Sequence, residues 1–336
     1  MKRKNNATKR ILVLELGMLA VLLVVALVVR FALTQAAFSP DDLQSTDSTT
    51  LTESTGATTP PTTEPAPTWK TYPADRQLLA QQYFVYDCKT STFLTISGKE
   101  SERIYPASIT KLFTAYVAMQ YLQPETEIIA GSELNMVVWG SSVAGIEKGD
   151  KLTAGQLVEA MLLPSGNDAA YMLATAAGRA MKNNPNLSAA AAVQAFMVQM
   201  NTQAKAVGMT GTNFVNPDGI HDSQHYTTFA DLAILGKLSM ENPTIMEHAV
   251  TPIKQVQLHG ETIEWKNTNA LVNPASEYYC PYTVGLKTGQ TPSAGSCLLS
   301  AFRKGDTELI IGVFGCPETE DRFDDTLQLF NQIVLK

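Results

Sequence analysis

Cysteine is scarce in this chain, with four residues among 336 and no Cys-x-x-Cys spacing. The low number excludes a small fold held together by disulfides, and the spacing offers neither a thiol redox pair nor a cysteine-based zinc site. Apolar residues make up 45% of the chain and charged residues 17%, which excludes a wholly disordered or collagen-like protein. We therefore expect a globular domain.

Positive charge is in short supply beyond the first ten residues. Residues 1–10 contain five Lys or Arg and no acidic residue, although the net charge of the whole chain is −7. The remainder is therefore more acidic than the total indicates, and an acidic surface repels phosphate backbones. Nucleic acid is excluded as an expected partner.

One long apolar run lies near the N-terminus. Ile11 to Val29 contains a single charged residue, Glu15, and as a helix it would span about 28 Å, close to the hydrocarbon thickness of a bilayer. The basic tail, residues 1–10, would stay in the cytoplasm. Residues 11–37 are thus predicted to be a single-pass anchor that leaves an extracytoplasmic domain on the cell membrane. The alternative is a cleaved signal segment and a secreted protein.

Residues 38–69 are rich in Ser, Thr and Pro and contain almost nothing to bury. Such a segment does not offset its own ordering entropy, so we expect an extended linker. Residues 70–336 remain, and they are long enough to form one folded catalytic domain with a layered core.

The apolar pattern of this domain predicts strands near both of its ends, at 83–86, 92–96, 282–286, 297–302 and 308–314. Helical spacing and capping residues predict helices at 108–122, 153–163, 167–178, 188–208, 228–242 and 323–334. This order indicates a mixed α/β fold with one sheet assembled from the two ends of the domain.

A Ser-x-x-Lys motif, Ser108 to Lys111, opens the first of these helices. The spacing places hydroxyl and amine on the same face of the helix, within hydrogen-bond reach. A lysine activates a serine only when burial or nearby positive charge lowers its pKa. Taken alone, the motif is more typical of an N-capping serine with a solvated lysine than of a catalytic pair.

Two more short motifs follow. Ser165-Gly166-Asn167 lies in a break between helices, where the hydroxyl can relay a proton and the amide can hold a carbonyl group. Lys287-Thr288-Gly289 follows an apparent strand, where a small residue lets a peptide lie alongside. Each is also compatible with an ordinary helix cap or surface turn. The order of the three motifs is the informative feature.

This trio occurs in penicillin-binding proteins and class A β-lactamases. The sequence resembles the serine-type D-alanyl-D-alanine carboxypeptidases, the low-molecular-mass penicillin-binding proteins, over residues 75–336. The most specific stretches are 105–112, 163–170 and 285–289. The resemblance implies a β-lactamase/transpeptidase-like fold, with an antiparallel sheet flanked by helices and an all-helical subdomain.

The resemblance also implies roles for the catalytic residues. Ser108 would attack the amide between the two terminal D-alanines of a peptidoglycan stem peptide, with Lys111 as the base, kept neutral by Lys287. Ser165 would pass the proton to the departing D-alanine. β-Lactam antibiotics such as penicillins would acylate Ser108, and the reaction would need no metal or organic cofactor.

Substrate binding is implied for a second group of residues. Asn167 would hold the peptide and orient the base, and Lys287 with Thr288 would bind the terminal carboxylate at the strand that Gly289 keeps open. Backbone N–H groups of Ser108 and Gln290 would form the oxyanion hole.

Departures from the family pattern leave alternatives open. Asp218 stands where relatives often have His, and we expect it to affect a loop and not the chemistry. Relatives often carry a terminal amphipathic anchor, whereas the final helix here is expected to be part of the core. A β-lactamase on the same fold lacks support because no Glu-x-x-Leu-Asn segment follows Ser165. A non-catalytic wall-binding protein is the third possibility.

Overall fold

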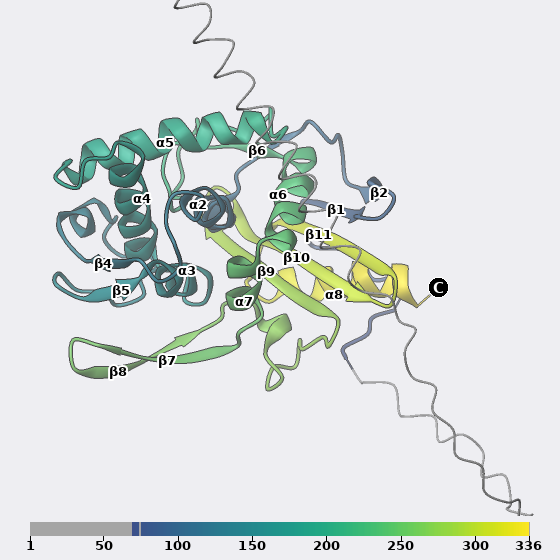
Figure 1. The fold of residues 1–336 in the computed structure, drawn as a ribbon. Coiled ribbons are helices and arrows are strands. Elements are labelled where there is room, and N and C mark those ends of the chain that lie inside the picture. Colours follow the sequence, from purple (N-terminus) through teal and green to yellow (C-terminus); the bar gives the residue numbers. More distant parts are fainter. Residues whose placement is uncertain (1–68, 74, 336) are drawn as a thin grey trace, which may run out of the picture. The chain divides into compact units, whose positions relative to one another are not determined.

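The computed structural model describes residues 69–73 and 75–335, and Figure 1 traces them from purple to yellow. The expected basic tail, the anchor or signal segment and nearly all of the expected linker lie outside the described residues. Among the described residues, no helix is both long and apolar enough to cross a membrane. The four cysteines are all free thiols.

A five-stranded antiparallel sheet forms the centre, in the order β2-β1-β11-β10-β9. Its strands are β1 (Gln82–Asp87), β2 (Thr92–Ile96), β9 (Thr283–Thr291), β10 (Gly295–Lys304) and β11 (Thr307–Cys316). The first strand pairs with the last one, Tyr83 opposite Val313, so the two ends of the domain meet inside one sheet. The predicted origin of the sheet is confirmed.

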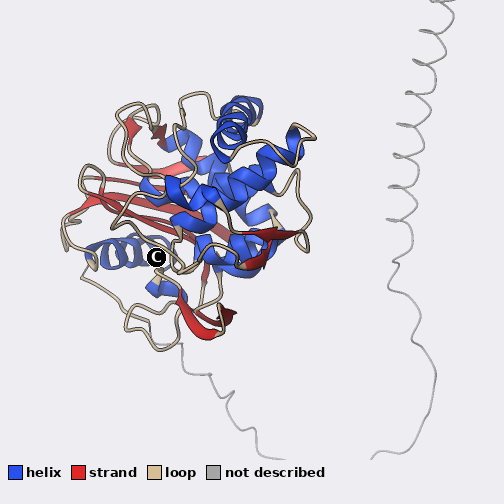
Figure 2. Cartoon of the chain, turned by 90° about the vertical axis from the view of Figure 1, so that its left-hand side faces the viewer, coloured by secondary structure: helices blue, strands red, loops and turns tan. Residues whose placement is uncertain are grey.

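Helices cover both faces of this sheet (Figures 1 and 2). Seven α-helices are present in the described part of the chain: α2 (Thr110–Ala118), α3 (Ala154–Leu162), α4 (Asn167–Met181), α5 (Ala189–Ala206), α6 (Phe229–Glu241), α7 (Pro243–Ala249) and α8 (Asp321–Val334). Helix α8 packs on one face of β10 and β11, and α6 on the other. Helices α2 to α5 form a helical region beside the sheet.

Short elements complete the domain. They are β3 (Arg103–Ile104), the 3₁₀ turn η1 (Ala107–Ile109), β4 (Glu127–Ile129), η2 (Ser132–Met136), β5 (Lys151–Thr153), β6 (Thr227–Thr228), β7 (Ile253–Leu258), β8 (Glu261–Lys266) and η3 (Ala270–Val272). The β7–β8 hairpin, which the sequence analysis did not predict, projects from the lower left in Figure 1.

Local signals explain most helix boundaries. Thr153 and Gln156 form the capping box that starts α3, and the side chain of Ser188 accepts the N–H of Ala191 at the start of α5. The prediction that α4 ends at Gly178 is wrong, since this helix continues to Met181. A Cβ on Gly178 would lie 2.0 Å from the carbonyl oxygen of Ala192, so this glycine permits close helix packing.

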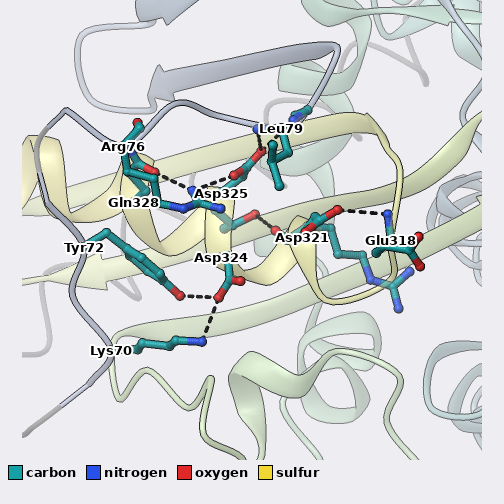
Figure 3. Close-up of polar contacts among 12 residues, drawn as sticks. Lys70, Tyr72, Arg76, Leu79, Glu318, Asp321, Asp324, Asp325 and Gln328 are labelled. Atoms are coloured by element: carbon teal, nitrogen blue, oxygen red, sulfur yellow. Dashed lines mark hydrogen bonds and ion pairs between the residues drawn. The ribbon is translucent and has the colours of Figure 1, made fainter.

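The final helix belongs to the core. Phe323, Leu327 and Phe330 of α8 are buried against the sheet, as expected. Its polar side holds an N-terminal strap, residues 69–73 and 75–80, through the contacts drawn in Figure 3.

The buried carboxylate of Asp325 is the principal anchor of this strap. It accepts hydrogen bonds from Nη1 of Arg76 at 2.7 Å and from the N–H groups of Leu79 and Ala80 at 2.7 and 2.6 Å. Asp324 binds Nζ of Lys70 at 2.9 Å and the hydroxyl of Tyr72. The strap and α8 thus form one polar unit on the outer face of the sheet.

Candidate active site

Ser108 and Lys111 lie one helical turn apart, in η1 and the first turn of α2. Nζ of Lys111 donates a hydrogen bond to Oγ of Ser108 at 2.9 Å and another to the carbonyl oxygen of Asp218 at 2.8 Å. The lysine side chain is completely buried. Its two hydrogen bonds, one to the hydroxyl of Ser108 and one to the carbonyl oxygen of Asp218, therefore fix the position of the amine beside the serine.

A strained turn presents Ser108. Ala107 has a positive φ of 47°, a conformation that L-residues with a Cβ rarely adopt. Gly219 packs against this turn, with a φ of 85°, so closely that a Cβ would lie 1.9 Å from the carbonyl oxygen of Ala107. A Cβ on Gly289 would lie 3.2 Å from the amide nitrogen of Ser108. Two glycines therefore let the loop and strand β9 close around the serine.

Burial is the main influence on the charge state of Lys111. It lowers the pKa of this amine to about 8, although the negative charges of Asp218 and Asp168 oppose the shift. The pKa of Lys287 is lowered well below its usual value, first by burial and then by repulsion from Lys111 and Arg322. Burial of Lys111, more than repulsion by Lys287, thus provides the reactive neutral amine.

Ser165 lies in the predicted break between α3 and α4, and Asn167 is the first residue of α4. Ser165 is buried with a positive φ of 66°, and the N–H of Asn167 donates to the carbonyl oxygen of Ser142 at 2.9 Å. Within the described residues, Oδ1 of Asn167 is buried without a hydrogen-bond partner. Asn167 makes no hydrogen bond to Lys111 there, and Asp218 instead provides the second contact of that lysine.

Lys287 and Thr288 lie on β9, opposite the serine. Nζ of Lys287 donates to the carbonyl oxygen of Thr288 at 3.1 Å and to Oγ1 of Thr268 at 3.3 Å. The hydroxyls of Thr268 and Thr288 are themselves 2.6 Å apart. Two hydroxyls therefore stand in front of a buried cationic side chain, and the sequence analysis had not singled out Thr268.

These residues surround one cavity of about 590 Å³. Two of the eight predicted site residues, Lys111 and Lys287, are buried behind the wall of the cavity. The other six line it: Ser108, Ser165, Asn167, Thr288, Gly289 and Gln290. Among the described residues, no carboxylate lines the cavity, and Arg322 is its one charged lining residue. The cavity is suited to an anionic, hydrogen-bonding ligand.

Two residues at the site were given no role in the chemistry by the sequence analysis. Arg322, in the first turn of α8, lies with Nη1 3.4 Å from the carbonyl oxygen of Gly289, and its Nε has no partner among the described residues. Asp218 was expected to affect a loop, yet it is buried and its main chain contacts Lys111. Burial raises the pKa of its carboxyl group.

Comparison with known proteins places this geometry in a family. The family model described as D-alanyl-D-alanine carboxypeptidase (peptidase S11) matches residues 68–318. A D-alanyl-D-alanine carboxypeptidase of Streptomyces sp. strain K15 is 31% identical over 257 residues, covering 73% of this chain and 84% of that protein. Carboxypeptidase DacF of Bacillus subtilis is 28% identical, covering 66% of this chain and 54% of DacF. This chain thus spans about half the length of DacF.

Solved structures give the same result. The Streptomyces K15 DD-transpeptidase superposes with a TM-score of 0.67 at 28% identity, covering 76% of this chain and 97% of that one. Penicillin-binding protein D2 of Listeria monocytogenes, solved in a cefotaxime-bound form, gives 0.62 at 25% identity, covering 76% and 98%. The predicted transpeptidase-like fold is confirmed. The chain belongs to the D-alanyl-D-alanine carboxypeptidase family.

Proposed function

We propose that this protein is a serine-type carboxypeptidase that removes the terminal D-alanine from peptidoglycan stem pentapeptides through an acyl-enzyme on Ser108. The observation that supports this most strongly is the 2.9 Å contact between Nζ of Lys111 and Oγ of Ser108, made by a lysine whose pKa burial lowers. A serine hydroxyl needs such a base to become a nucleophile.

Acylation begins when the neutral form of Lys111 takes the proton of Ser108. With a pKa of about 8, roughly a tenth of this amine is neutral at pH 7. Oγ then attacks the carbonyl carbon of the penultimate D-alanine. The N–H groups of Ser108 and Gln290 bind the oxyanion, in keeping with the close approach of β9 to Ser108 that Gly289 permits.

The leaving D-alanine must gain a proton as its amide bond breaks. Ser165, which lines the cavity, passes this proton from Lys111 to the departing amine, while Asn167 holds the peptide. The terminal carboxylate binds the hydroxyls of Thr288 and Thr268, supported by Lys287 behind them and by Arg322. Fixing that carboxylate limits the substrate to the end of a chain.

Deacylation returns Ser108 to its starting state. Water attacks the ester carbonyl with Lys111 again as the base, and D-alanine-shortened peptide leaves. Penicillins acylate Ser108 in the same way. Their esters persist because, among the described residues, no glutamate lines the cavity to activate a deacylating water as in class A β-lactamases.

A primary amine can replace water as the acceptor of the acyl group. This second activity, transpeptidation, is favoured by one observation: the matching Streptomyces K15 structure is described as a DD-transpeptidase. Release of D-alanine in the presence of an amine acceptor, with transfer product measured beside hydrolysis product, separates the two outcomes.

We further propose that residues 11–37 anchor the protein in the cell membrane and that residues 38–69 link this anchor to the catalytic domain, residues 70–336, outside the cytoplasm. The apolar run and the basic residues before it support this arrangement. Fractionation of cells, with mass spectrometry of the mature N-terminus, tests anchoring against signal cleavage.

The central experiment uses the full-length chain with a stem pentapeptide. We expect release of one D-alanine per peptide and a covalent adduct with a reporter penicillin, both lost in Ser108→Ala. Timed mass spectrometry of the adduct separates a carboxypeptidase, which keeps the adduct, from a β-lactamase, which hydrolyses it quickly. A chain that takes up no penicillin and releases no D-alanine would instead be a non-catalytic wall-binding protein.

A further inference from the structure

A tryptophan stands almost fully in solvent next to the cavity. Trp139 is 98% exposed, whereas Trp265 is buried and Trp69, the third tryptophan of the chain, is partly buried. Its neighbours Val138 and Val143 are 49% and 51% exposed. We call these three residues the tryptophan rim. A large exposed aromatic side chain in an apolar patch is typical of a binding surface.

The rim is continuous with the wall of the cavity. The three residues between Trp139 and Val143, namely Gly140, Ser141 and Ser142, all line the cavity. Trp139 is bonded directly to Gly140, so it lies one residue from the cavity wall. The rim therefore adjoins the cavity at this side.

The segment behind the rim is held in place by buried groups. The carboxylate of Asp168 accepts the N–H groups of Ala144 at 2.9 Å and Ile146 at 3.0 Å. Nε1 of Trp265 donates to the carbonyl oxygen of Ala144 at 2.8 Å. Asn167, a predicted substrate-binding residue, holds Ser142 through its N–H.

The turn that carries Trp139 is closed as well. The N–H of Ser141 donates to the carbonyl oxygen of Val138 at 3.2 Å. The exposed indole is thus presented by an ordered turn, so a ligand that packs on it loses little free energy to ordering the loop.

We propose that the tryptophan rim binds the stem-peptide residues that precede the two D-alanines, with their aliphatic side chains packed on the indole face. This inference rests on the proposed function. The departing D-alanine ends in the carboxylate that Thr288 and Thr268 face inside the cavity. The part of the substrate that extends beyond the cavity is therefore the acyl side, and Trp139 favours long stem peptides over short ones.

Kinetics with two substrates test this preference. The kcat/KM for a stem pentapeptide is divided by that for N-acetyl-D-alanyl-D-alanine, which is too short to reach the rim. We expect Trp139→Ala to lower this ratio about tenfold and Trp139→Phe to retain most of it. Val198→Ala, at a 65% exposed site on α5, is the matched control and keeps the ratio. An unchanged ratio in Trp139→Ala overturns the inference.

Fluorescence tests binding directly. Because Trp139 is the one strongly exposed tryptophan, titrating full-length Ser108→Ala with the pentapeptide should shift its emission to shorter wavelength and saturate. The shift should be missing when Trp139→Phe is added. A shift caused by lipid vesicles without peptide, or by raising the protein concentration alone, identifies a membrane or a second copy of the chain as the occupant and overturns the inference.

The two levels of proposal fail differently. If the unaltered chain releases D-alanine but its substrate ratio does not depend on Trp139, the rim is not a peptide site although the proposed function stands. If no substrate releases D-alanine, the proposed function fails. The fluorescence titration then tests peptide binding at the rim independently of activity. A saturable shift in emission supports binding at the rim, and the absence of a shift overturns the inference.

Discussion

The side chain of Lys111 contacts the backbone of Asp218. The carbonyl oxygen of Asp218 accepts a hydrogen bond from Nζ of Lys111 at 2.8 Å, and the carboxylate of the same residue raises the pKa of that amine against the effect of burial. Asp218 thus fixes the base in space and influences its charge. The other titratable groups around the pair are Asp168, Tyr171, His225 and Lys287.

The pH dependence of acylation should show the effect of Asp218 on the pKa of Lys111. Acylation needs neutral Lys111, so its rate should rise with pH and level off above about pH 8. Asp218→Asn removes a negative charge that raises the pKa of Lys111. The rising limb should therefore move to lower pH, and the rate at pH 7 should increase by up to about tenfold, the limit set by the neutral fraction.

Penicillin acylation followed by stopped-flow mixing across pH 5 to 10 measures this limb. Asp222→Asn is the control, because it removes a carboxylate from the same loop that does not act on Lys111. If the rising part of the pH–rate profile lies at the same pH in Asp218→Asn as in the unaltered chain, the carboxylate has only a structural effect.

Ser108→Ala should abolish D-alanine release and penicillin labelling while leaving the fold intact. The hydroxyl accepts one hydrogen bond from Lys111 and lies at the cavity wall, so its loss removes little packing. Residual activity should be lower by at least about 10³-fold. Thermal melting within a few degrees of the unaltered chain checks the fold. Persistent labelling would place the nucleophile elsewhere.

Lys287→Ala should impair recognition of the terminal carboxylate. The amine of Lys287 donates to the hydroxyls of Thr288 and Thr268, so its removal leaves both hydroxyls without this donor. We expect a higher KM for the pentapeptide, a lower kcat, and at least about a tenfold smaller preference for the free acid over the C-terminal amide of the same peptide. A fall in kcat with that preference intact contradicts a carboxylate-binding role.

Gly219→Ala should displace the catalytic turn. A Cβ at this position would lie 1.9 Å from the carbonyl oxygen of Ala107, so the backbone before Ser108 must move. We expect acylation to fall at least about tenfold and the free energy of unfolding to fall by more than the about 1–2 kcal/mol that a positive φ alone costs. Gly149→Ala, also at positive φ but with nothing within 4 Å, should show only that smaller cost. If Gly219→Ala and Gly149→Ala lower acylation and stability equally, the close contact between Gly219 and Ala107 does not position the catalytic turn.

Asp325→Ala should release the N-terminal strap from α8. The substitution removes the ion-pair partner of Arg76, although Gln328 still accepts a hydrogen bond from it. It also leaves the buried N–H of Ala80 and the partly buried N–H of Leu79 without an acceptor. Because Arg76 is 22% exposed, the expected loss is about 2–3 kcal/mol of unfolding free energy, below the range for fully buried ion pairs. Urea unfolding measures it. Lys151→Ala breaks an exposed ion pair and should cost at most about 1 kcal/mol.

The fold was predictable where local signals and tertiary packing agree. Thr153 and Gln156 identify the start of α3 because a capping box needs only two residues three positions apart. The helix that was predicted to stop before Pro243 does end at Glu241. The sequence analysis did not predict α7, which begins at Pro243 because proline suits the first helical position after the Asn242 cap. Gly178 misled for a different reason: its small size serves packing against α5.

At the site, the three motifs predicted which residues come together, because each motif is contiguous in sequence. Arg322 and Thr268 line the same cavity from two other segments, and Trp139 adjoins the lining residue Gly140 in a third. No spacing rule connects these positions. The contact between Asp218 and Lys111 is made by a carbonyl oxygen, which every residue has, so residue type could not reveal it. Roles that depend on backbone atoms or on distant segments require coordinates.

The pairing of the first strand with the last has a consequence for biosynthesis. During translation β1 and β2 emerge early, but their neighbour β11 is made after all the other strands of the sheet, so the sheet cannot close before β11 has emerged. Strand β9, which stands against Ser108, is also made long after β1 and β2. A nascent chain that has not yet reached β9 therefore carries the serine and its lysine without the opposite wall, and it gains a complete catalytic cleft only when the last strands have been made.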